Sequence, residues 1–83
     1  MMENSHQKLT LDRPARYQIK VLGELDSSWS DWNWQMKVRV EYDDALPITI
    51  LTGSVDQAGL HGLLRRLYAL GLPLISVIHV DVE

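Results

Sequence analysis

The sequence predicts a single α+β domain, ordered β-β-β-α-β, in which one amphipathic helix packs on one face of a four-stranded mixed sheet. Apolar and polar residues alternate with period two over 16–25 and again over 36–42, as in half-buried strands. Leucines then recur at helical spacing, and a β-branched run closes the chain over 74–82. At 83 residues the chain has room for one hydrophobic core.

The first element follows a polar segment. Residues 1–15 lack periodicity, so we expect a flexible N-terminal tail and a single domain over 16–83. In the first strand, Tyr17, Ile19 and Val21 share one face, and Gly23 marks a bulge or the strand end.

The second and third strands are joined by a turn-forming segment. Met36–Tyr42 alternates cleanly, and 48–51 is a short β-branched run that Thr52 and Gly53 close. The residues over 43–47 predict a hairpin connection that is longer than a two-residue turn.

The helix has a clear start, stripe and end. Ser54 and Gln57 have the spacing of a capping box, and Asp56 lies in the first turn, where it complements the macrodipole. Gly71 and Pro73 predict the end of the helix. The expected apolar stripe consists of Leu60, Leu63, Leu64, Leu67 and Tyr68.

The fourth strand decides the predicted topology. Its first half is apolar on both faces, which is typical of a strand inside a sheet. A right-handed crossover through the helix makes the fourth strand parallel to the third. If the first three strands form a meander, the first and third strands are also parallel. The fourth strand then fits beside the first, and we expect the spatial order 4-1-2-3. The sheet face away from the helix then carries a mixed set of side chains, which could pack against a second subunit: Lys20, Leu22, Lys37, Arg39 and Glu41.

Composition excludes several classes of function. A net charge of −3 and a pI near 5.5 argue against nucleic-acid binding, which depends on clustered Lys and Arg. We expect no membrane span and a cytoplasmic location. The chain has no cysteine, and its three histidines show no ligand spacing, so we expect no metal and no cofactor. Enzyme activity is left open by the sequence, which favours a non-enzymatic role. Because disulfides are absent and the core is small, we expect self-association.

The tryptophans gather in one loop, where Trp29, Trp32 and Trp34 surround Asp31. The favoured interpretation is packing, because tryptophan rings bury a large area at one end of a thin core. The other interpretation is an exposed platform for a protein partner, a ring-shaped metabolite or a sugar.

Two further residues are candidates for a binding site. Ser54, as the predicted helix start, lies where free amide groups form a generic anion site. His61 lies one position off the apolar stripe and is best interpreted as a partly exposed helix residue. It could act as a general base or pH switch, with Asp56 or Tyr68 as helper, but no such pairing is set by the spacing.

Two motifs carry a resemblance. The loop Trp29-Ser-Asp-Trp32 and the helix opening Asp56-Gln-Ala-Gly-Leu-His-Gly-Leu-Leu64 are similar to a group of short uncharacterised bacterial proteins. Gly59 stands where that group suggests alanine. The resemblance implies a free-standing bacterial domain and supplies no substrate.

Together these observations predict a small interaction or regulatory module that forms a homo-oligomer. The contact surface would be the open sheet face, a sheet edge or the tryptophan loop, and an unknown protein partner is compatible with each. The alternative is a domain that binds an anionic or aromatic metabolite through the tryptophan loop and the helix N-terminus.

Overall fold

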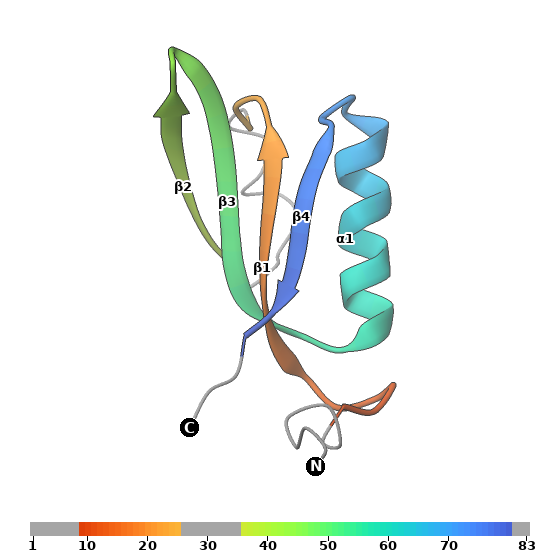
Figure 1. The fold of residues 1–83 in the computed structure, drawn as a ribbon. Coiled ribbons are helices and arrows are strands. Elements are labelled where there is room, and N and C mark those ends of the chain that lie inside the picture. Colours follow the sequence, from red (N-terminus) through yellow and green to blue (C-terminus); the bar gives the residue numbers. More distant parts are fainter. Residues whose placement is uncertain (1–8, 26–35, 81–83) are drawn as a thin grey trace.

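The fold is an antiparallel sheet with one helix (Figure 1). The computed structural model describes residues 9–25 and 36–80. Hydrogen bonds order the strands β2-β3-β1-β4, and every neighbouring pair is antiparallel. The elements are β1 (Ala15–Leu22), β2 (Met36–Asp43), β3 (Leu46–Val55), α1 (Gln57–Ala69) and β4 (Leu74–His79).

The predicted α+β class is confirmed, but the predicted strand order and the mixed sheet are wrong. β1 pairs with β3 and β4 rather than with β2. A tight hairpin places β2 beside β3, and β1 occupies the other side of β3 because residues 23–35 are long enough to avoid a direct hairpin between β1 and β2. β4 runs in the same direction as β3, as expected, since both are antiparallel to β1.

The β2–β3 hairpin turns on two residues, not on the longer connection that the sequence predicts. Asp43 pairs with Leu46, and the residues between them, Asp44 and Ala45, have φ angles of 53° and 68°. Positive φ at both central residues is the requirement of a type I′ turn, in which Asp-Gly is a favoured pair. Ala45 therefore occupies a position that suits glycine better.

We expect Ala45→Gly to stabilise the domain by about 0.5–1 kcal/mol. Glycine adopts a positive φ without the steric cost that alanine pays in the folded state. The greater conformational entropy of glycine in the unfolded chain offsets only part of this gain. Thermal unfolding followed by circular dichroism measures this. Ala58→Gly makes the same chemical change in the first turn of α1 and should destabilise by up to about 1 kcal/mol. A lower melting temperature for Ala45→Gly would contradict the interpretation of the turn.

β3 is longer than predicted and changes where the helix begins. Residues 52–54 pair with β1, and 52–53 also pair with β2, so Ser54 belongs to the strand and the predicted capping box is wrong. The N-cap is Asp56, whose carboxylate accepts a 2.7 Å hydrogen bond from the amide of Gly59. The Gln57 side chain instead donates to the Tyr17 hydroxyl at 2.6 Å, which ties the start of the helix to β1.

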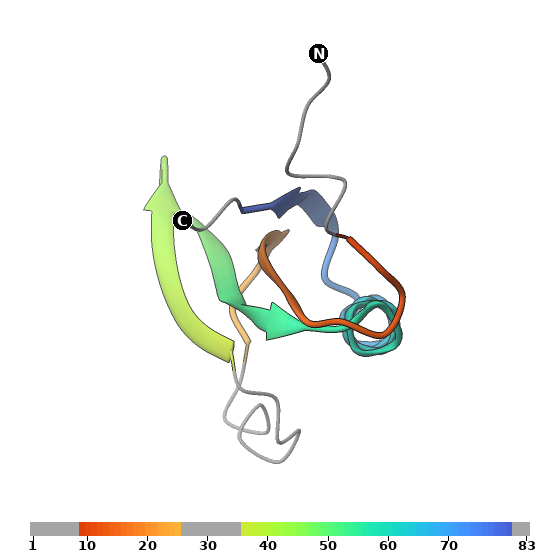
Figure 2. The same cartoon turned by 90° about the horizontal axis from the view of Figure 1, so that it is seen from below.

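The core lies between α1 and one face of the sheet, and Figure 2 shows the helix on that side. Leu60, Leu63 and Leu67 of the predicted stripe are buried, Leu64 is partly buried, and Tyr68 is exposed. The sheet contributes the remaining buried core residues: Tyr17, Ile19, Val21, Met36, Leu51 and Val55.

The exit from β1 is held by a buried polar contact. Thr49 is completely buried, and its hydroxyl donates to the Gly23 carbonyl at 2.6 Å and accepts from the Leu25 amide at 3.3 Å. Gly23 has φ +114°, a conformation that L-residues rarely adopt, and its amide donates to the Pro47 carbonyl at 2.8 Å. The predicted bulge or strand end at Gly23 is thus a left-handed exit from the strand.

Candidate functional site

The free edge of β4 is the first candidate site. β4 pairs with β1 on one side, and no strand of the described segments, 9–25 and 36–80, pairs with it on the other. An edge strand presents unpaired backbone donors and acceptors, so proteins usually shorten, charge or cover it.

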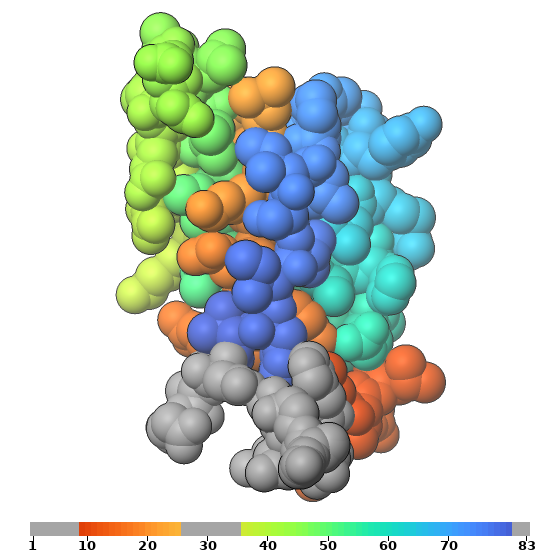
Figure 3. Space-filling view, in the orientation of Figure 1, coloured from red at the N-terminus to blue at the C-terminus, as the bar shows by residue number. Residues whose placement is uncertain are grey.

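The side chains of β4 are apolar and exposed. Ile75, Val77 and Ile78 keep 49%, 36% and 48% of their surface accessible, and Leu74 is also exposed. In Figure 3 the side chains of β4 lie open on the face of the molecule that is turned to the reader. The sequence from Leu67 to Val80 contains no Asp, Glu, Lys or Arg. We name Leu74, Ile75, Val77 and Ile78 the β4 patch.

The backbone of β4 is also oriented for further pairing. The Val80 amide donates to the Arg16 carbonyl at 2.9 Å, which fixes the alternation of hydrogen-bonded pairs along the β1–β4 ladder. Ile19 and Val77 then form a non-hydrogen-bonded pair. The N–H and C=O of Val77 therefore point away from β1, toward the free edge. The edge offers both backbone groups and apolar side chains to another strand.

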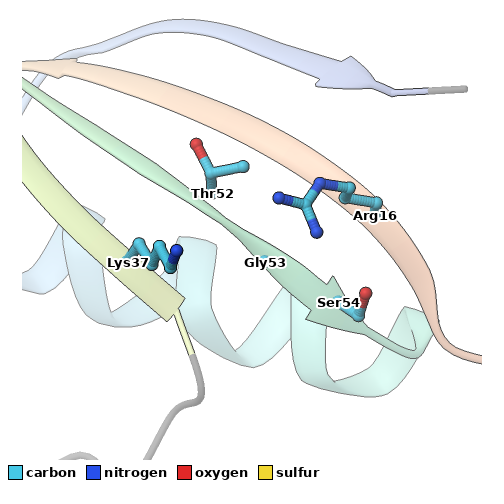
Figure 4. A pocket seen from close by; sticks show the side chains of 5 residues that line it. All are labelled: Arg16, Lys37, Thr52, Gly53 and Ser54. Atoms are coloured by element: carbon cyan, nitrogen blue, oxygen red, sulfur yellow. The ribbon is translucent and has the colours of Figure 1, made fainter. Parts of the chain in front are cut away.

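A hollow on the open face of the sheet is the second candidate site. It is an open depression of about 230 Å³, lined by Arg16, Lys37, Thr52, Gly53 and Ser54. Figure 4 shows these side chains on three adjacent strands, with α1 behind the sheet. The hollow therefore lies on the face opposite the hydrophobic core.

The structure separates the residues that the sequence singles out. Ser54 is exposed and lines the hollow on the open face. His61 is exposed on α1, and the helix packs on the other face, so the two residues do not share a site. The remaining candidates, Trp29, Asp31, Trp32 and Trp34, lie outside the described residues.

The helix N-terminus offers less to an anion than its sequence implies. Asp56 is the N-cap, and its carboxylate already accepts from the Gly59 amide. A negative charge at this place satisfies a free amide and complements the macrodipole from within the chain. A bound anion would have to displace that carboxylate or lie beside a like charge.

Sequence reasoning missed Arg16 and Thr52 as site residues, and it also missed the patch on β4. The uncharged run over 67–80 is a signal for the patch, since edge strands usually carry a charge. No sequence pattern indicates the hollow, because it forms only where β3 pairs with β1 on one side and with β2 on the other. Side chains that are far apart in sequence meet only through that register.

The fold and these two surfaces define a small α+β domain with a free apolar sheet edge. The family model described as "Domain of unknown function (DUF8691)" matches residues 16–78, so the chain belongs to this family. The match is consistent with the resemblance to uncharacterised proteins. The search of the curated proteins and that of the solved structures found no match.

Two other findings concern the described residues alone. Within 9–25 and 36–80, no helix has the length and apolar character that crossing a bilayer requires. In the same segments, no three His, Asp or Glu side chains gather closely enough to hold a metal ion.

Proposed function

We propose that this domain is an interaction module that self-associates, two copies joining through antiparallel pairing of their β4 strands. The observation that carries the proposal is the free, uncharged and apolar β4 edge. Pairing would extend the four-stranded sheet into one of eight strands, and it would bury part of the β4 patch of both copies.

The two edges of the sheet differ in a way that supports a specific contact at β4. β2, at the opposite edge, carries Lys37, Arg39, Glu41 and Asp43 along its length. Charges of this kind discourage unintended strand pairing, whereas β4 has none. A long exposed apolar edge without charge invites aggregation unless a partner covers it.

A second copy of the chain is the occupant that suits β4 best. A two-fold contact requires a self-complementary surface, and a strand without charged residues meets its own copy without repulsion. Burial of apolar surface then contributes about 25 cal/mol per Å². A small domain with a thin core gains stability from such a contact.

We expect Val77→Lys to weaken the dimer at least about tenfold, because the two lysines would approach each other across the two-fold axis. Multi-angle light scattering over a concentration series measures the dimer population. Val38→Lys is the matched control, since Val38 lies on the other edge strand, faces the same side of the sheet and has the same accessible fraction of 36%.

Two results would overturn the proposal. One is a monomer at every concentration for the unsubstituted chain. The other is equal weakening by Val38→Lys, which would place the contact elsewhere. Because the chain has no cysteine, Val77→Cys gives a second readout: with Val77 at the two-fold axis, oxidation should cross-link the two copies efficiently, whereas Val38→Cys on β2 should form no cross-link.

A further inference from the structure

We propose that the hollow on the open face is an anion site that takes the phosphate group of a small phosphate ester. The site consists of Arg16, Lys37, Thr52 and Ser54, and it is separate from the β4 edge. Its volume of about 230 Å³ is smaller than the usual range for drug-sized ligands, which indicates a small ligand.

The strand register explains how the four side chains meet. Arg16 of β1 lies opposite Ser54 of β3, and Lys37 of β2 lies opposite Thr52 of β3. Thr52 and Ser54 are two positions apart, so they share a face of the strand. The two cationic side chains therefore lie on opposite sides of β3, which carries the two hydroxyl groups, as Figure 4 shows.

The charges at the hollow are uncompensated within the described part of the chain. There, neither Arg16 nor Lys37 takes part in an ion pair, whereas Arg39 on the same face pairs with Glu41 at 3.2 Å. Two cations on one face of a chain with net charge −3 form a local positive field. An anion placed between them would relieve their repulsion.

The donor set matches a phosphate better than a single carboxylate. An arginine offers two parallel N–H donors to neighbouring oxygens, and a lysine adds a compact charge. The hydroxyl groups of Thr52 and Ser54 supply two further donors. A tetrahedral dianion has enough oxygens to use all four residues, and the remaining space admits a short organic group.

The test is a titration followed by ¹⁵N–¹H NMR at constant ionic strength, first with inorganic phosphate and then with glycerol phosphate. We expect saturable shifts at residues 16, 37 and 52–54, and tighter binding of the ester. Arg16→Gln and Lys37→Gln should each weaken phosphate binding about tenfold, because each removes a charge-assisted contact. Light scattering on the same samples follows dimer formation separately.

Arg39→Gln is the matched control, because it removes one positive charge from the same face without touching the hollow. Its phosphate affinity should stay within about twofold of the unsubstituted chain. If Arg39→Gln and Arg16→Gln lowered the phosphate affinity equally, the effect would come from the net charge of the face rather than from a specific site, and the proposal would be overturned. Shifts that map to another part of the chain, or an ester that binds more weakly than phosphate, would also overturn the proposal.

Discussion

Leu63→Ala should reduce the free energy of unfolding by about 2–5 kcal/mol, the largest loss that we expect from a single substitution. Leu63 is completely buried at the centre of the α1 stripe, between Leu60 and Leu67. Removing its side chain forfeits apolar burial and leaves a cavity that the thin core cannot fill by collapse. A small domain has only about 5–15 kcal/mol of stability to lose.

Chemical denaturation in urea measures this loss, and two neighbours on the helix provide a graded control. Leu64 is partly buried, so Leu64→Ala should cost less. Arg65 is exposed, so Arg65→Ala should change stability by about 0.5 kcal/mol or less. If the three alanine variants lost the same free energy of unfolding, α1 would not pack on the sheet through this face.

Gly23→Ala should cost about 1–3 kcal/mol through backbone strain alone. Gly23 has φ +114°, and a Cβ there would lie 2.7 Å from Cδ2 of Leu72. The exit of β1 is also held by Thr49, so the backbone cannot relax without breaking that contact. We therefore expect a lower melting temperature together with weaker protection of the Leu25 amide in hydrogen exchange.

Gly71→Ala is the control, because Gly71 also has positive φ, at +79°, but its Cβ would meet nothing within 4 Å. Its cost should be confined to strain, about 1–2 kcal/mol. In the double variant Gly23→Ala/Leu72→Ala, the new Cβ no longer clashes with the Leu72 side chain. Its loss of unfolding free energy should therefore be smaller than the sum of the losses in the two single variants. Additive losses would show that Leu72 does not press on position 23.

The two proposed surfaces are compatible in one assembly. Antiparallel pairing of identical strands has its two-fold axis perpendicular to the sheet, so both copies present the same face to the same side. A β4-paired dimer would then carry its helices on one side and its two hollows on the other. The edge contact and the anion site can therefore be removed independently, by Val77→Lys and Arg16→Gln.

The sequence predicts part of the candidate site and misses the rest for a physical reason. Ser54 is singled out as the start of the helix, yet it lines the hollow because β3 continues to Val55. Arg16 and Lys37 lie 21 positions apart, and no local pattern connects them. Cross-strand pairing places both beside β3, and pairing is a property of the whole sheet.

Local patterns in the amino-acid sequence were enough to predict the α+β class, the approximate position of each element and the helix residues that form the core. These follow from local periodicity, since alternation and the leucine spacing each suit one backbone geometry. The predicted order already placed the fourth strand at an edge beside the first, whereas the structure was needed to show that β3 rather than β2 lies on the other side of β1 and that the β2–β3 turn has two residues. Strand order depends on which non-local pairings bury the most surface together, and short-range patterns carry no information about that choice.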